Sequence, residues 1–104
     1  KSSSTPEIKL YCDEKIKFSL LDKIVEDIPK HYDTGVDLIT IDGVRLETEN
    51  FWFLLRASNT QNCIVFRLEH FVKDKFKEEL IKLISILNKY SLDIKELTSF
   101  NQTV

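Results

Sequence analysis

The sequence contains no basic block, no long apolar run and no signal-peptide pattern. These absences argue against nucleic-acid-binding, membrane-spanning and secreted proteins. Its 15 basic and 17 acidic residues give a formal charge of −2, which argues against a nucleic-acid-binding domain. No apolar run approaches the roughly 18 residues that a membrane span needs. We therefore expect a cytoplasmic protein that binds neither nucleic acid nor a membrane.

Cysteine and histidine are too few and too scattered for a metal or redox centre. Cys12 and Cys63 fall in predicted strands without CxxC or Cys/His spacing, so we expect reduced, mostly buried thiols. A disulfide is the alternative if their Cα atoms lie within roughly 7 Å of each other. His31 and His70 have no second ligand at metal-binding spacing and are expected to be solvated. No metal ligand and no catalytic residue is predicted in this chain.

The length of 104 residues, of which 42% are hydrophobic, suits one domain with one core. Methionine is absent, the first residue is Lys1, and residues 1–6 are mostly polar. We therefore expect a linker at 1–6 and a fragment of a longer protein. Residues 90–104 form a C-terminal tail, which is either a short helix around 92–97 or a mobile segment.

Hydrophobic periodicity predicts the order β-α-β-β-β-β-α. Asp13 is a good N-cap for the first helix, and Pro29 ends that helix. Asp42-Gly43 predicts a type I′ hairpin turn, which needs positive φ at both central residues. The predicted strands are 7–12, 36–41, 44–47, 51–55 and 63–69. The second helix has an apolar face made of Phe71, Val72, Phe76, Leu80, Leu83, Ile84 and Leu87.

Alternation along the strands assigns side chains to the two faces of the sheet. The more apolar face, which carries Phe51, Phe53 and Leu55, should be covered by the helices. The opposite face carries Trp52, Leu54 and Arg56 from one strand and Val65, Arg67 and Glu69 from the next. Its apolar members, Trp52, Leu54 and Val65, either face a missing partner surface or are shielded by the C-terminal tail. Arg67 is expected to stack on Trp52 if the two strands pair.

The connector between the two strands after residue 50 concentrates groups that suit a phosphate. Arg56 offers a planar fork of donors, and Ser58 and Thr60 each offer a hydroxyl. Asn59 tolerates the positive φ of a tight bend, which would turn backbone N–H groups toward one point. The alternative is an ordinary solvated hairpin turn.

Three motifs in this order and spacing resemble the C-terminal domain of the α-D-phosphohexomutases, and the likeness is greatest to the phosphomannomutase/phosphoglucomutase group. The similarity runs from residue 5 to the helix that ends near residue 88. The loop departs from the family in one respect, since Gln61 and Asn62 stand where a glutamate and a proline often follow the threonine. The motifs are Ile41-Asp42-Gly43-Val44-Arg45-Leu46, then Phe51 to Thr60 with its Arg56-Ala57-Ser58-Asn59-Thr60, then Phe66-Arg67-Leu68-Glu69.

The resemblance implies an α+β, TBP-like domain at residues 7–89, in which two helices pack on one face of an antiparallel sheet. It assigns binding of the substrate phosphate to Arg56, Ser58, Asn59 and Thr60. The parent enzyme would be an isomerase that moves a phosphoryl group between positions 1 and 6 of a hexose, using a phosphoserine and Mg²⁺. Neither element is in this chain, which would have no cofactor and no activity of its own.

The expected partners are therefore a hexose phosphate and the other domains of the parent enzyme. Two rival interpretations belong to other classes of protein. The first is a non-enzymic module that binds a protein through Trp52, Leu54 and Val65. The second is a single-strand RNA binder, which the charge and the absence of an RNP-type Gly-Phe pattern disfavour.

Overall fold

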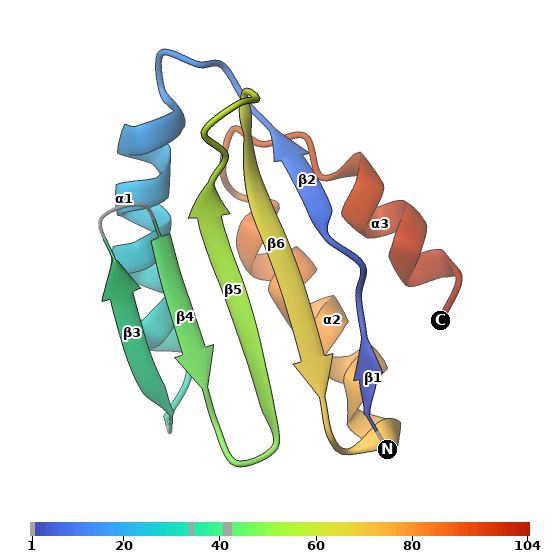
Figure 1. Cartoon of the computed structure of the whole chain (residues 1–104). Coiled ribbons are helices and arrows are strands. Elements are labelled where there is room, and N and C mark those ends of the chain that lie inside the picture. Colours follow the sequence, from blue (N-terminus) through green and yellow to red (C-terminus); the bar gives the residue numbers. More distant parts are fainter. Residues whose placement is uncertain (1, 34, 41–42) are drawn as a thin grey trace.

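The computed structural model describes residues 2–33, 35–40 and 43–104 and has the expected α+β architecture, with a six-stranded antiparallel sheet (Figure 1). The strands follow the order β1-β6-β5-β4-β3, and β2 also pairs with β6. The strands are β1 Ser3–Ser4, β2 Ile8–Tyr11, β3 Val36–Thr40, β4 Gly43–Glu47, β5 Phe51–Ala57 and β6 Cys63–His70. The helices are α1 Lys17–Asp27, α2 Phe76–Leu87 and α3 Lys95–Gln102, with 3₁₀ turns at Ile28–His31 and Lys73–Lys75. The described residues contain no helix long and apolar enough to cross a membrane.

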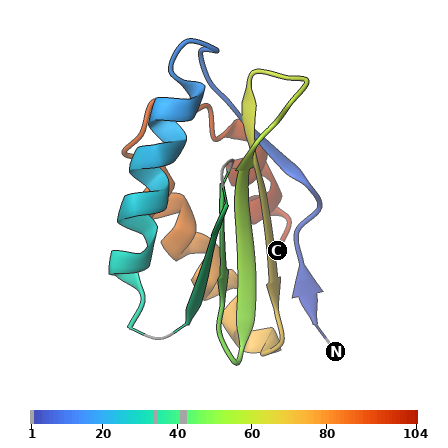
Figure 2. The same cartoon turned by 60° about the vertical axis from the view of Figure 1, so that its left-hand side comes forward.

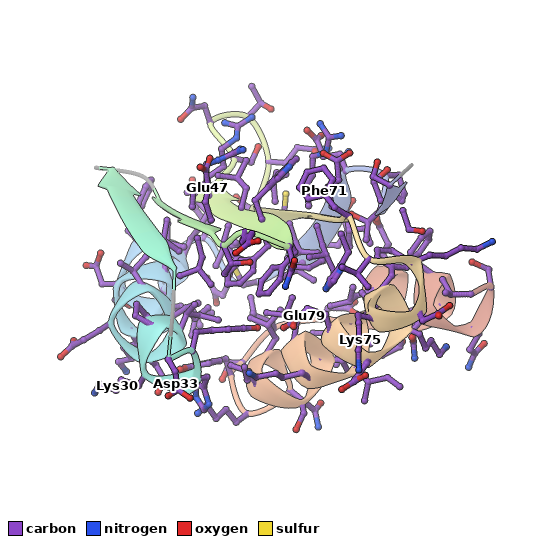
Figure 3. The ribbon with its side chains drawn as sticks, turned by 90° about the horizontal axis from the view of Figure 1, so that it is seen from below. Lys30, Asp33, Glu47, Phe71, Lys75 and Glu79 are labelled. Atoms are coloured by element: carbon purple, nitrogen blue, oxygen red, sulfur yellow. The ribbon has the colours of Figure 1, made fainter. Side chains whose placement is uncertain are left out.

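The core lies between the sheet and the layer formed by α1 and α2, which cover the same face (Figure 2). The predicted alternation in β5 is confirmed, because Phe51, Phe53 and Leu55 are buried while the residues between them are only half-buried. The view from below shows side chains filling the space between the layers, with Glu79 of α2 lying inside it (Figure 3). From the helices the core receives Leu20, Leu21, Ile24, Ile28, Phe76, Leu80, Leu83 and Leu87.

Both helices begin later than the sequence predicts. The N-cap of α1 is Ile16, which makes no capping bond with its side chain. The carboxylate of Asp13 instead accepts a bond from the Lys15 backbone N–H at 2.9 Å, so it closes a turn before the helix. Pro29 lies in the 3₁₀ turn that follows α1 and ends it as expected. The second helix begins at Phe76. Phe71 and Val72, which were expected on its apolar face, precede it and are exposed.

Gly43 belongs to a strand and has no positive φ, so the predicted role of this residue in a type I′ turn is wrong. It pairs with Thr40 on one side and with Arg56 on the other. A Cβ added at Gly43 would lie 2.1 Å from the Leu55 carbonyl oxygen. The glycine is therefore needed for the close approach of β4 to the end of β5. Asp42 lies outside the described residues.

Both chain ends are tied to the domain. The segment predicted as a linker contains β1, whose residues pair with His70 and Glu69 of β6. The buried Thr5 donates its N–H to the Leu68 carbonyl at 2.9 Å. The tail contains α3, which packs against β2 and α2 and buries Leu97 completely.

One of the two histidines departs from the expectation of a solvated side chain. His70 is only 4% exposed, and its ring stacks on Phe51 with 5.3 Å between the centroids. Its Nδ1 accepts a bond from the Val72 N–H at 3.0 Å, and burial lowers its pKa. His31 is exposed, as expected.

The cysteines are both free thiols. Cys63 is fully buried and Cys12 is half-buried. Burial raises the pKa of the Cys12 thiol, which makes it a poor nucleophile.

Candidate functional site

The loop between β5 and β6, residues 58–62, lies at the same end of the sheet as the start of α1 (Figures 1 and 2). Ser58 organises the bend. Its backbone N–H donates to the Cys63 carbonyl at 3.0 Å, and its Oγ accepts bonds from the N–H groups of Thr60 (3.3 Å) and Gln61 (3.1 Å). The bend forms without a positive φ at Asn59, contrary to the expectation for that residue. The Ser58 hydroxyl hydrogen remains available as a donor, because both of these bonds use the oxygen as an acceptor.

One pocket of about 300 Å³ brings together all four predicted site residues, Arg56, Ser58, Asn59 and Thr60. Arg56 lies on the open face of the sheet, at the end of β5 beside this loop. In the part of the chain that the structure describes, no hydrogen bond or ion pair engages its guanidinium. The pocket therefore contains a cation whose donors are available to a ligand.

Lys9 is a second cation in the pocket, and the sequence analysis missed it. Arg56 pairs with Val65 in β6, and Val65 pairs with Lys9 in β2. The two cationic residues thus lie two strand spacings apart, roughly 10 Å between Cα atoms, on either side of a valine that is only 5% exposed. Alternation along β2 puts Lys9 on the face opposite to the buried Ile8 and Leu10, but its proximity to Arg56 depends on pairing between segments that are distant in the sequence.

Glu7 is the one acidic side chain among the described residues that line the pocket, against the two cations Arg56 and Lys9. The lining therefore carries a net positive charge, together with hydroxyl, amide and backbone donors. Such a set of groups is suited to a tetrahedral oxyanion. No cluster of three or more His, Cys, Asp or Glu that could hold a metal ion occurs among residues 2–33, 35–40 and 43–104.

Lys17, the first residue of α1, supports the loop from the helix side. It is only 7% exposed, and its Nζ donates to the carbonyl oxygens of Ser58 at 2.9 Å and Gln61 at 3.2 Å. The sequence analysis missed this residue too. A signal was present, because Lys17 stands three and four residues before Leu20 and Leu21, on the apolar face of the helix.

The open face of the sheet is covered by charged side chains near Trp52. The Arg45 guanidinium lies 4.1 Å from the Trp52 ring centroid, and that of Arg67 lies 6.0 Å away. The Trp52 Nε1–H donates to Glu69 at 2.9 Å. A bond from the Ser2 hydroxyl and this one from Trp52 lower the pKa of Glu69. The expected contact of Arg67 with Trp52 is thus present, and Arg45 was missed.

An open apolar patch of Trp52, Leu54 and Val65 does not form, since Val65 is buried and the other two are half-buried. The tail does not provide this cover, because α3 lies beside β2 at the sheet edge (Figure 1). The interpretation of the chain as a protein-interaction module therefore loses the exposed apolar surface on which it depended.

Residues 7–83 match the family described as phosphoglucomutase/phosphomannomutase, C-terminal domain. The chain belongs to this family. Among curated proteins, it is 39% identical to a phosphomannomutase/phosphoglucomutase of Pseudomonas putida, over 77% of this chain and 18% of that protein. It is 33% identical to a probable phosphoglucosamine mutase of Pyrococcus horikoshii, over 88% of this chain and 19% of that protein.

Among solved structures, a phosphoglucomutase/phosphomannomutase family protein of Burkholderia thailandensis matches with a TM-score of 0.57 and 28% identity. The match covers 89% of this chain and 19% of that one. The chain therefore spans about a fifth of the length of these relatives. Their names identify the full-length relatives as mutases.

Proposed function

We propose that this domain binds the phosphate group of a hexose phosphate in the pocket beside loop 58–62. The observation that carries the proposal is the Arg56 guanidinium, which lines the pocket with Ser58, Asn59 and Thr60 and has no partner among the described residues. Arginine matches the geometry of phosphate oxygens, and charge-assisted bonds are the stronger class of hydrogen bond.

In this proposal the domain is part of a phosphohexomutase whose other domains carry out the intramolecular transfer between positions 1 and 6. The phosphoserine and the Mg²⁺ would belong to those domains, and this chain alone would be inactive. Binding a phosphate remote from the reacting one would orient the sugar, so that binding energy is used to align the reacting end. The family membership of the chain supports this role.

The test is a titration of the ¹⁵N-labelled chain with glucose 1-phosphate, with neutral glucose as the control ligand. We expect amide shifts clustered at residues 56–62, with millimolar affinity, because a few screened charge-assisted bonds are opposed by the entropy of association. Glucose should cause no such cluster. Absence of shifts at tens of millimolar glucose 1-phosphate, or shifts scattered over other regions, would contradict the proposal.

The matched variants are Arg56→Ala and Arg67→Ala, which each remove one arginine from the open face. Arg56→Ala should abolish measurable binding and leave the melting temperature within a few degrees of the parent, since an end-of-strand arginine contributes little to the core. Arg67→Ala should bind as the parent does. A large loss of thermal stability in Arg56→Ala would instead show that Arg56 is structural.

A further inference from the structure

The shape of loop 58–62 depends on which way its peptide groups face. In a trans peptide the C=O and the following N–H point in opposite directions, and no cis peptide occurs among the described residues. The Ser58 carbonyl points to the Lys17 ammonium, and so does that of Gln61. The N–H groups of Asn59 and Asn62, which belong to the same two peptide units, therefore point away from α1.

The four amides of the loop thus fall into two classes. Those of Thr60 and Gln61 donate to the Ser58 Oγ and are already occupied. Those of Asn59 and Asn62 have no acceptor in the part of the chain that the structure describes. Of this unoccupied pair, Asn59 lines the pocket with Arg56, whereas Asn62 is not among the lining residues.

Lys17 has the burial and the position to impose this arrangement. It is more than nine-tenths buried, and it makes no ion pair with a carboxylate of residues 2–33, 35–40 or 43–104. Its ammonium is therefore solvated chiefly by the two loop carbonyls, and releasing the loop would leave a buried charge without acceptors. That cost keeps the two carbonyls turned toward α1.

We propose that Lys17 is a positioning residue for phosphate binding, which turns the Asn59 N–H group toward the anion by holding the Ser58 carbonyl. The inference rests on the proposed function of the pocket. It attributes the geometry of the loop to Lys17, which does not itself line the pocket. The positive charge of Lys17 behind the loop adds to the attraction for an anion.

The first test needs no variant. In the parent chain, inorganic phosphate should shift the amide proton of Asn59 downfield more than those of Thr60 and Gln61, because only Asn59 among these lining residues has an amide free to donate. Larger shifts at Thr60 and Gln61 than at Asn59 would overturn the inference. No shift anywhere in residues 56–62 would instead contradict the proposed function itself.

The second test compares Lys17→Met with Lys23→Met, which removes the same charge from an exposed position of α1. We expect Lys17→Met to weaken phosphate affinity about tenfold, which is roughly 1.4 kcal/mol in binding. It should also speed hydrogen exchange of the Thr60 and Gln61 amides, whose bonds to the Ser58 Oγ depend on the shape of the loop. Lys23→Met should stay within about twofold of the parent. Lys17→Arg, which keeps a charged donor, should recover most of the affinity.

The variants separate the two proposals. If the parent binds phosphate and a folded Lys17→Met binds it equally well with an unchanged loop, the role of Lys17 is wrong and the pocket stands. If Lys17→Met does not fold, the pattern of shifts in the parent and the affinity of Lys17→Arg decide. Loss of binding in Lys17→Arg together with larger shifts at Thr60 and Gln61 would count against the inference.

Discussion

Two regions of this domain treat their charged side chains in opposite ways. At loop 58–62 the Arg56 guanidinium has no partner among the described residues. Where α1 and its 3₁₀ turn meet α2, the charges are paired. Asp27 accepts bonds from Lys89 Nζ at 2.7 Å and from the Tyr90 hydroxyl. Charges that are paired, as at the helix junction, are typical of a structural region. A charge without a partner, as beside the loop, is typical of a region that binds a ligand.

Tyr32 and Glu79 show the same pattern deeper in the junction. The Tyr32 hydroxyl donates to the Glu79 carboxylate at 2.6 Å, and burial together with this bond raises the pKa of Tyr32. The Lys82 ammonium lies 4.0 Å from the centroid of the Tyr32 ring and donates to the His31 carbonyl at 2.9 Å. Glu79 lies between the two layers (Figure 3). The hydrogen-bonding groups of Tyr32, Glu79 and Lys82 are thus bonded within the domain, whereas the Arg56 guanidinium has no partner among the described residues.

The largest effect on stability is expected from Gly43→Ala, which disturbs the pairing of β4 with the end of β5 beside loop 58–62 without changing a charge. The added Cβ would lie 2.1 Å from the Leu55 carbonyl oxygen and 2.7 Å from the Arg56 Cα, so the backbone of β5 must move. We expect a loss of about 3 kcal/mol in the free energy of unfolding, measured by urea denaturation. Phosphate binding should also weaken, since Gly43 pairs with Arg56. A loss below about 1 kcal/mol would show that the strands separate easily.

Local patterns predicted much of this domain because alternation and helical periodicity reflect burial directly. They gave the order of strands and helices and placed Arg56 on the open face of β5 and Phe53 in the core, and the resemblance added the packing of two helices on one face of an antiparallel sheet. They failed where two local choices compete or distant segments meet. Asp13 closes a turn and does not cap the helix, although its residue type favours the cap. The two are alternatives, because either hydrogen bond satisfies the Asp13 carboxylate.

The sequence predicted only part of the candidate site, for a related reason. Arg56, Ser58, Asn59 and Thr60 are neighbours along the chain, so one loop predicts them. Lys9 lies 47 residues before Arg56, and Lys17 lies 41 residues before Ser58, so no spacing rule connects either lysine to the site. Likewise, His70 is buried by packing on Phe51 across a strand pair, which its position at a strand end did not indicate.

An intermediate effect is expected from Asp27→Asn, which tests the helix junction. The Lys89 and Tyr90 bonds hold the pKa of Asp27 at about 2, below its ordinary value of 3.8. A carboxylate with a lowered pKa stabilises the fold above the unfolded pKa, and this stability is lost as the pH falls toward the folded pKa. Since the side chain is 25% exposed and partly screened, we expect Asp27→Asn to cost about 1 kcal/mol at neutral pH.

The measurement is urea denaturation from about pH 7 to pH 2, with Asp22→Asn as the control on an exposed position of the same helix. The difference between Asp27→Asn and the parent should shrink as the pH falls below about 4 and be smallest at pH 2, where the folded-state carboxyl is half protonated. Asp22→Asn should differ little from the parent throughout. A difference that persists unchanged at low pH would show that shape, rather than charge, holds this junction.

The smallest effect is expected from Lys9→Met, which removes the second cation of the pocket and keeps its apolar stem over Val65. Because a half-buried lysine with a flexible stem contributes a screened point charge in place of a fixed fork of donors, we expect phosphate affinity to fall only about two- to threefold at low salt, and the difference to vanish near 0.5 M salt. Glu7→Gln should change the affinity in the opposite direction, since it removes the one carboxylate among the described residues of the lining. An unchanged affinity in both variants would leave Arg56 and the loop as the whole of the site, whereas a tenfold loss in Lys9→Met would make Lys9 a direct ligand equal to Arg56.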